Sequence, residues 1–455
     1  MTVADEFAGL VGADHVLTGA RLAMRNPGWC HASQGAGLLV RPADTAQVAA
    51  VVRLAGRLAL GVVAQGGLTG LVEGTQSQPG EVIVSFERMN RVLAIDPAQG
   101  VVVVEPGVRL ADLDAALAPH GVMIGVDIGA RDSCTIGGMV ATNAGGIRVL
   151  RHGMMRHNVL GLEVVLASGA VLDLAVPLVK NNAGYDLKQV FIGSEGTLGL
   201  VTRIALRLWP RPQGSACAMI GLDPAALAAL VPRLRAALGD RLSALEGLWP
   251  DCYAYIARSI GLTRLPLAVG QGLYMIVEAT GADDASARDA LEAALTPALE
   301  NGTLTDAVIA QSQADRAAIW RIRESGGALG SDGALVLSYD IGLRLADLDV
   351  YVTRLRARAE ARFPGVATLV LGHVGDGNLH VMFPVEKDAD RVPFDSLVYG
   401  VLAGFSGSTI SAEHGIGLEK RAALQAATQP EVLSAMRALK LAFDPENRLN
   451  PGKVL

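Results

Sequence analysis

The chain has 455 residues, which is long enough for two or more domains with a large hydrophobic core. Hydrophobic residues make up 51% and charged residues 18%, which excludes an intrinsically disordered protein. A net charge of −6 without a Lys- or Arg-rich run argues against a nucleic-acid-binding surface. The acidic N-terminus does not resemble a signal peptide, and no apolar run approaches a membrane span. We therefore expect a protein of the cytoplasm or of its membrane surface.

The four cysteines, at positions 30, 134, 217 and 252, are far apart and form no CxxC motif. This spacing indicates neither an iron–sulfur cluster nor a disulfide framework. Free cysteines behave as small hydrophobic residues, so we predict four buried thiols.

Helices and strands are predicted to alternate in the first half of the chain. Residues 44–60 have helical periodicity behind a capping Asp44 or Thr45, and residues 110–118 form a short helix. Ser168-Gly169 marks a hairpin, and Pro210 and Pro212 end the pattern, so we place a domain boundary near residue 212. The predicted strands are 61–64, 82–85, 101–105, 162–166, 171–174 and 199–208.

The second half of the chain has a different composition and a different pattern of predicted elements. Alanine-rich helices, at 224–238 and 284–299, alternate with strands at 272–278 and 334–340. This alternation predicts an α+β layer with one sheet covered by helices. From residue 425 we expect a helix that gives way to a segment rich in Asn and Pro.

Glycine is enriched to 53 residues and occurs in clusters. Three clusters, at 66–70, 133–146 and 192–199, lie in the first domain. Glycine-rich turns expose backbone N–H groups to an anion such as the pyrophosphate of a dinucleotide. None of the clusters fits GxGxxG or the P-loop, which disfavours a Rossmann fold and the use of ATP. Each cluster alone is also compatible with a tight turn, but three with Ser, Thr and Asn interleaved favour a binding site.

Two further glycine-rich segments carry three of the eight histidines. They are GHVGDGNLH at 372–380 and SAEHGIG at 411–417. His and Glu are ligands that suit zinc and other first-row divalent metals. Any one of these histidines alone is more often structural, but the set together with a glutamate indicates a metal site with an acid or base beside it.

The order of motifs along the chain resembles that of a known family. The chain is similar to the FAD-linked dehydrogenases of the vanillyl-alcohol oxidase/p-cresol methylhydroxylase superfamily, within the D-lactate dehydrogenase, D-2-hydroxyglutarate dehydrogenase and glycolate oxidase D-subunit group. The matching motifs are RPADT (41–45), QGGLTGL (65–71), TIGGMVATNAGG (135–146), GYDLK (184–188), FIGSEGTLG (191–199), the two histidine segments and NPGKV (450–454).

The resemblance implies an α+β fold with a two-lobed PCMH-type FAD-binding domain at 1–212. It also implies an antiparallel-sheet substrate (cap) domain at 213–409 and a C-terminal segment, 410–455, that returns to the FAD domain and completes the active site.

The resemblance also implies FAD-binding residues. The pyrophosphate is expected at Gly66, Gly67, Leu68, Thr69 and Gly70. The flavin and its ribityl chain are expected at Ser133, Gly137, Gly138, Thr142 and Gly145, the adenine at the backbone of Val201, and the flavin ring near Asn450. Leu68 departs from the Asn common in the family, which removes one polar contact but keeps the backbone cradle. No histidine lies in the first loop, so FAD is expected to be non-covalent.

Oxidation of an α-hydroxy acid requires a base for the hydroxyl proton and a hydride acceptor, which is flavin N5. A divalent metal, Zn²⁺ or alternatively Mn²⁺ or Fe²⁺, would acidify the hydroxyl and position the substrate. We predict His414 as the base, because histidine titrates near neutrality, in a loop formed around Gly415 and Gly417. The predicted metal ligands are His373, His380 and Glu413.

Arg323 matches the family's arginine for the substrate carboxylate, an anion that suits a bidentate guanidinium. A solvated helix arginine is the alternative, and Arg321 is a nearby competitor.

The substrate is predicted from three positions at which this chain differs from the hydroxyglutarate members of the family. Where the hydroxyglutarate members have Thr, Lys and Asn, this chain has Gly327, Ser338 and Met382, none of which supplies a cation for a distal carboxylate. This favours a short acid such as D-lactate, unless Arg344 or another residue compensates. D-2-hydroxyglutarate or D-malate dehydrogenase and a glycolate oxidase flavoprotein subunit are the alternatives.

Other functions remain open at this point. A metallohydrolase would use the same histidines but would leave the glycine clusters unexplained. A non-catalytic flavoprotein subunit or an oxidase is also compatible with the fold. The electron acceptor, whether a quinone, a cytochrome or an electron-transfer flavoprotein, and the oligomeric state, including a homodimer, are not encoded in these motifs.

Overall fold

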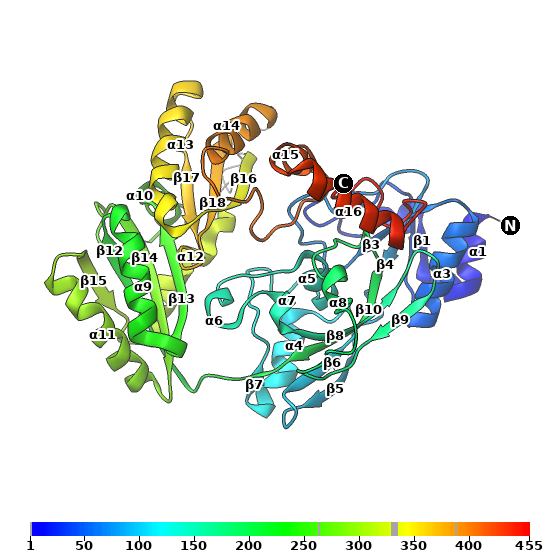
Figure 1. The fold of residues 1–455 in the computed structure, drawn as a ribbon, viewed down its shortest axis with the longest axis horizontal. Coiled ribbons are helices and arrows are strands. Elements are labelled where there is room, and N and C mark those ends of the chain that lie inside the picture. Colours follow the sequence, from blue (N-terminus) through cyan, green and yellow to red (C-terminus); the bar gives the residue numbers. More distant parts are fainter. Residues whose placement is uncertain (1, 263, 329–334, 387–388) are drawn as a thin grey trace. The chain divides into compact units, whose positions relative to one another are not determined.

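The computed structural model describes residues 2–262, 264–328, 335–386 and 389–455. The chain divides into two compact units. The first contains Met1–Gly145, His152–Arg211 and Glu413–Leu455, and the second contains Gly146–Arg151 and Pro212–Ala412. Each unit has sheets and helices of its own (Figure 1).

The first unit contains a small mixed sheet in the order β1-β2-β4-β3. β1 and β2 are antiparallel, whereas β4 is parallel to both β2 and β3. The helix α3 packs valines and leucines into the core of this lobe, and it begins where the Asp44 side chain accepts the N–H of Gln47. The bounds are β1 Val16–Thr18, β2 Leu38–Val40, β3 Gly61–Gln65, β4 Glu81–Ser85, α1 Val3–Val11 and α3 Thr45–Arg57.

The last residues of the chain extend this sheet. Val62 donates its N–H to the carbonyl of Arg448 and accepts the N–H of Asn450, each at 2.7 Å. A parallel bridge joins Val62 to Leu449, so the segment after α16 (Pro430–Phe443) lies alongside β3. The edge of β3 is therefore paired by residues from the far end of the sequence.

The second sheet of this unit is antiparallel, in the order β5-β6-β10-β8-β9. The predicted hairpin is confirmed as β8 and β9. Its core also contains side chains from α4 and α5. The bounds are β5 Val92–Asp96, β6 Val101–Val104, β8 Val159–Val165, β9 Val171–Leu174, β10 Leu200–Arg207, α4 Leu110–Leu117 and α5 Ile136–Thr142. Shorter elements are β7 Val122–Met123, β11 Trp209–Pro210, α2 Gly19–Ala23, α6 Val149–His152, α7 Met155–Asn158 and α8 Lys188–Phe191.

The second unit is built on a seven-stranded antiparallel sheet in the order β15-β12-β14-β13-β17-β18-β16. The helices α9 and α11 pack on one face of its strands (Figure 1). The opposite face, which carries Cys217 and Met219, is covered by α10 and α12. The strands are β12 Gly214–Leu222, β13 Leu242–Leu248, β14 Leu273–Gly281, β15 Leu304–Ile309, β16 Leu335–Gly342, β17 Leu369–Gly372 and β18 Asn378–Val385. The helices are α9 Leu227–Leu238, α10 Pro250–Ser259, α11 Asp284–Glu300, α12 Gln313–Glu324, α13 Leu348–Arg362 and α14 Val392–Leu402.

The predicted α+β fold class is confirmed, and most predicted elements lie within a few residues of their expected bounds. Position 334 of the predicted strand 334–340 falls outside the described residues. The prediction of a single helix from residue 425 is wrong. The structure has two helices in this part of the chain: α15 (Arg421–Ala427) ends at Ala427, and α16 begins at Pro430. Pro430 disfavours helical backbone at the preceding Gln429, which is extended with ψ 141°, and proline itself fits the first turn of α16, so the helix is interrupted at this point.

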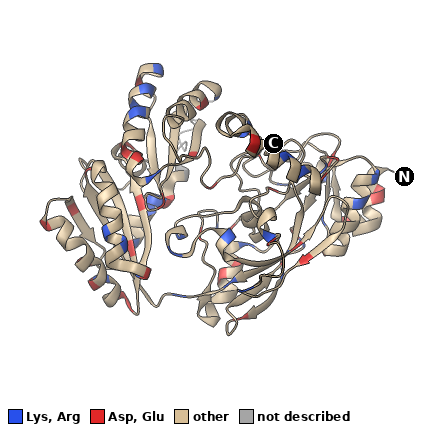
Figure 2. Ribbon diagram, in the orientation of Figure 1, with Lys and Arg blue, Asp and Glu red and all other residues tan. Residues whose placement is uncertain are grey.

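The prediction of four buried thiols is confirmed. All four cysteines are buried and free. Among the described residues, no helix combines the length and apolar character that crossing a bilayer requires. Lys and Arg are interspersed with Asp and Glu along the ribbons (Figure 2).

Candidate active site

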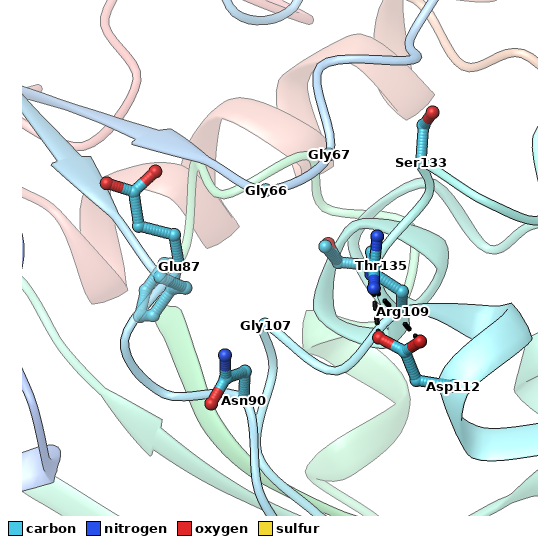
Figure 3. A pocket seen from close by; sticks show the side chains of 10 residues that line it. Gly66, Gly67, Glu87, Asn90, Gly107, Arg109, Asp112, Ser133 and Thr135 are labelled. Carbon is cyan, nitrogen blue, oxygen red and sulfur yellow. Dashed lines mark hydrogen bonds and ion pairs between the residues drawn. The ribbon is translucent and has the colours of Figure 1, made fainter.

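The first glycine cluster, residues 66–70, follows β3 and borders two pockets of the first unit. A pocket of about 320 Å³ has Gly66 and Gly67 on one side and Ser133 and Thr135 on another (Figure 3). A second pocket of about 360 Å³ shares Gly67 and Ser133 with it. The other residues around the first are Phe86, Glu87, Asn90, Gly107, Arg109 and Asp112, and around the second Asn26, Gly28, Trp29, Leu68 and Thr69.

Close packing explains why two of these positions are glycine. A Cβ atom on Gly66 would collide with Thr135 Oγ1, and one on Gly67 would collide with the carbonyl oxygen of Ser133. Only glycine lets this loop approach the turn at residues 133–135 so closely.

The same loop offers hydrogen-bond donors. Within the described residues, the backbone N–H groups of residues 66–70 make no hydrogen bond to the protein. Unpaired N–H groups that border a pocket form a concave site for an anion. The loop therefore fits a pyrophosphate on geometry as well as on sequence.

Leu68 has a left-handed backbone conformation, with φ 57°. Asn tolerates this region far better than a branched apolar residue, for which it costs roughly 1–2 kcal/mol. The departure from the family's Asn is thus also a departure from the residue that this conformation favours.

The second cluster is a helix and not only a turn. Its helix α5 begins behind Thr135, whose side chain accepts the N–H of Gly138 at 3.3 Å. The N–H of Gly137 bonds the carbonyl of Pro106 at 2.8 Å, and the Thr142 hydroxyl bonds the carbonyl of Gly138 at 3.1 Å. Of the cluster's predicted flavin residues, Ser133 lines both pockets, whereas Gly137, Gly138, Thr142 and Gly145 line neither.

Val201 and Gly70 also lie outside the two pocket linings. Val201 is buried in β10, where the ladder with β8 shifts between Val201 and Arg203. Such a bulge takes backbone groups out of the ladder, which makes them available to another partner.

Asn450 is buried and left-handed, with φ 42°. Its amide nitrogen donates to the carbonyls of Glu195 at 2.8 Å and Gly74 at 3.1 Å. Its Oδ1 is buried and has no partner in the described part of the chain. A buried acceptor without a donor is unfavourable, so this oxygen fits a bound group that donates a hydrogen bond.

Glu195, in the third cluster, is buried as well. Its Oε1 accepts the N–H of Ile416 at 2.7 Å and its Oε2 accepts the N–H of Gly417 at 2.8 Å. Burial raises the pKa of the Glu195 carboxyl, although the two N–H donors and the charge of Lys420 act in the opposite direction.

In the second unit, His373 and His380 are brought together at the ends of β17 and β18. Their rings are nearly perpendicular, with centroids 5.4 Å apart, and each offers a ring nitrogen within 4.8 Å of the other's. His373 Nδ1 lies 2.7 Å from Oε1 of Glu246. Because a carboxylate only accepts, Nδ1 carries the proton and Nε2 keeps a lone pair that suits a metal.

Arg323 lies beside this histidine. Its Nε donates to Oε2 of Glu246 at 2.7 Å, and one terminal nitrogen lies 3.4 Å from Nε2 of His373. Its side chain is only 13% exposed, so a solvated helix arginine is excluded. Arg321, the competitor, is exposed and bonds the carbonyl of Ile260.

Glu413 and His414 lie where the chain passes from the second unit to the first. The predicted loop is confirmed, since no helix or strand covers residues 411–416, and Gly415 and Gly417 have positive φ values of 86° and 52°. Directly before them, the N–H of Ala412 donates to Oδ2 of the fully buried Asp340 at 3.1 Å.

Sequence reasoning missed the buried carboxylates that hold these groups. Glu246 is 1% exposed in the apolar run LSALEGL, and Asp340 is 0% exposed in LVLSYDIG. A lone carboxylate inside a buried strand requires partners, so its position in such a run was an available signal. Its partners were not available, because Glu246 and His373 are 127 residues apart.

Two family models and several known proteins are similar to this chain. An "FAD binding domain" family model matches residues 36–175, and one for "FAD linked oxidases, C-terminal domain" matches residues 212–454. A D-2-hydroxyglutarate dehydrogenase of Arabidopsis thaliana is 38% identical over 96% of this chain and 78% of the relative. One of Bos taurus is 39% identical over 94% and 79%. The fold is similar to that of p-cresol methylhydroxylase, with a TM-score of 0.76 at 17% identity over 99% of this chain and 96% of that one. The chain thus belongs to the FAD-linked D-2-hydroxyacid dehydrogenases and has the fold of p-cresol methylhydroxylase.

Proposed function

We propose that the protein oxidises D-2-hydroxyglutarate, or a related D-2-hydroxy dicarboxylic acid, to the 2-oxo acid and passes the hydride to FAD. The observation that carries this proposal is the buried Arg323–Glu246–His373 cluster, which can bind a carboxylate beside a metal ligand. The names of the relatives from Arabidopsis thaliana and Bos taurus support this substrate above the D-lactate that the sequence departures favour.

D-Lactate is the second candidate because two strand residues on the same face as His380 carry no charge that could bind a second carboxylate. Ser338 lies directly opposite Met382, as Asp340 does opposite His380, in the β16–β18 pairing. Alternate residues of a strand share a face, so both positions accompany His380 on its face without adding a charge. Arg344 is largely exposed and paired with Asp347, so it does not replace the missing cation there.

We assign the chain's own groups the following work. Arg323, held by Glu246, binds the substrate carboxylate, and its planar guanidinium allows two parallel bonds. His414 accepts the hydroxyl proton, for which imidazole has a suitable ordinary pKa. FAD, when bound, would supply the hydride acceptor, and a quinone, a cytochrome or an electron-transfer flavoprotein would take up the electrons.

We propose that His373, His380 and Glu413 hold a divalent metal, Zn²⁺ first and Mn²⁺ or Fe²⁺ as alternatives. The paired imidazoles support this ligand set, and a metal on Nε2 of His373 would take the place of the Arg323 nitrogen that lies 3.4 Å from it. A metal there would acidify the substrate hydroxyl and orient it.

For the cofactor, we propose non-covalent FAD with its pyrophosphate on residues 66–70 and its flavin near Asn450. The free N–H groups and the unpartnered Oδ1 of Asn450 support it. We further propose an FAD domain at 1–212, a substrate domain at 213–409 and a completing segment at 410–455, in a cytoplasmic protein or one peripheral to the membrane.

Anaerobic bleaching of the flavin tests the reaction. D-2-Hydroxyglutarate, D-malate and D-lactate are expected to bleach the visible flavin band, while the L-acids do not. We expect D-2-hydroxyglutarate to have the highest kcat/KM, measured with an artificial acceptor. A higher value for D-lactate would favour the second candidate, and a flavoprotein that no 2-hydroxy acid bleaches would refute the proposed reaction.

Removing the metal tests its role. After dialysis against a chelator, kcat is expected to fall about 100-fold, because the metal provides several kcal/mol of charge stabilisation in the transition state. Metal content, measured by mass spectrometry, should fall in parallel, and Zn²⁺ or Mn²⁺ should restore both. Full activity of a sample verified as metal-free would exclude the metal from the reaction.

A further inference from the structure

Glu195 has an unusual backbone for a glutamate. Its φ is 53°, in the left-handed region that side chains other than Gly, Asn and Asp rarely adopt. The side chain is buried, and neither pocket of the first unit is lined by it. A strained residue that persists in a buried site is held there by its surroundings and points to a functional constraint.

Both carboxylate oxygens of Glu195 accept hydrogen bonds from the loop that follows His414. One carboxylate oxygen binds the N–H of Ile416, and the other binds the N–H of Gly417. A Cβ atom on Gly415 would lie 2.7 Å from Oε1 of Glu195, so glycine is required at this point of the loop. Bonds from backbone N–H groups to a carboxylate are charge-assisted and short, which makes them strong positional restraints.

The backbone of Glu195 connects the same loop to the cofactor side of the unit. Its N–H donates to the carbonyl of Ala141 in α5 at 2.8 Å, and its carbonyl accepts the amide of Asn450 at 2.8 Å. Asn450 in turn binds the carbonyl of Gly74, which follows the first glycine cluster. One residue therefore joins α5, Asn450 and the loop at 413–417.

We infer that Glu195 is a positioning residue that fixes the loop carrying Glu413 and His414 relative to the flavin cradle. The inference rests on the proposed function, in which His414 is the base. In this inference the glutamate of the GSEGTLG motif holds the loop that carries the proposed base His414 and does not contact FAD. Its carboxylate acts through the backbone of Ile416 and Gly417 and does not touch the substrate.

The Glu195→Gln variant isolates this role. Its side chain keeps the size of glutamate but offers one acceptor oxygen, so one of the two N–H groups faces an NH₂ donor. We expect FAD content and the Kd for FAD to stay close to the wild-type values, because the substitution leaves the hydrogen-bond donors of residues 66–70 and the side chain of Asn450 in place. Hydrogen–deuterium exchange of a peptide covering residues 412–418 should accelerate, while exchange at residues 66–70 should not.

Catalysis supplies the second measurement. The rate of flavin reduction at saturating substrate should fall about 100-fold, as expected for displacement of a reacting group by about 1 Å, with a smaller change in KM. Glu163→Gln is the matched control, because Glu163 is a buried carboxylate of the same unit that binds the hydroxyls of Thr45 and Thr202. It should lower the melting temperature without a selective loss in the reduction rate.

The outcomes separate this inference from the proposed function. Unchanged exchange at 412–418, or normal flavin reduction in Glu195→Gln, would overturn the positioning role. Loss of FAD from the variant would instead make Glu195 a cofactor residue and also overturn it. If no hydroxy acid reduces the wild-type flavin, the proposed reaction fails, and the exchange data alone decide whether Glu195 holds the loop.

Discussion

Replacing His414 with Ala is expected to lower the rate of flavin reduction about 1,000-fold while FAD stays bound, in the range typical of a general base. The rate falls because alanine has no group that can accept the proton of the substrate hydroxyl. The loop itself should survive, because its backbone is held at Ala412 by Asp340 and at Ile416 and Gly417 by Glu195. Anaerobic stopped-flow absorbance measures the rate, and the visible spectrum reports the bound flavin.

His120→Ala is the control for removing an imidazole, because His120 is exposed and lies at the end of a surface helix in the same unit. We expect it to have the wild-type rate. A His414→Ala protein that reduces its flavin at near wild-type rate would exclude His414 as the base, whatever the fate of the metal.

The second large effect is expected at Glu246, the carboxylate shared by Arg323 and His373. In Glu246→Gln the amide cannot accept from both partners. If its oxygen keeps Arg323, its NH₂ donates to Nδ1 of His373 and moves the imidazole proton to Nε2, the proposed ligand atom. Metal affinity is therefore expected to fall 10- to 100-fold, the usual effect of losing a group that orients a metal ligand, with kcat/KM falling by about 100-fold or more.

Glu278→Gln provides a matched comparison. Glu278 lies on the neighbouring strand β14, is 1% exposed, and binds Arg148 and Arg316, the latter from the same helix α12 that carries Arg323. Burial alone would raise the pKa of Glu278, but these two arginines lower it. The variant should lose stability and keep its metal affinity. Equal metal affinity in wild type and Glu246→Gln would remove Glu246 from the metal site.

Local rules predicted the parts of the fold whose causes are local. Asp44 caps α3 as expected, and the loop around Gly415 follows from residues that tolerate positive φ. The helix α5 was missed because its two glycines disfavour a helix, although its cap, Thr135, was visible. There the packing of Gly137 against Pro106 outweighs intrinsic propensity.

The residue types that carry the proposed chemistry could be predicted from the sequence, but the buried carboxylate that holds them in place could not. His373, His380 and Arg323 could be selected because their motifs are short and ordered. Glu246 could not, because its contacts are made across 77 and 127 residues of sequence. A position in an apolar strand reveals that a carboxylate needs a partner but does not reveal which one.

The pairing of Val62 with residues 448–450 has a consequence for how the protein is made. The first sheet cannot complete its last pairing until residues 448–450 have left the ribosome. The intervening Pro212–Ala412 unit, by contrast, is nearly continuous in sequence and can collapse earlier during synthesis. The cofactor cradle next to β3 is therefore among the last parts to mature, so a chain truncated before residue 448 should fail to retain flavin even though every glycine of the cradle is present.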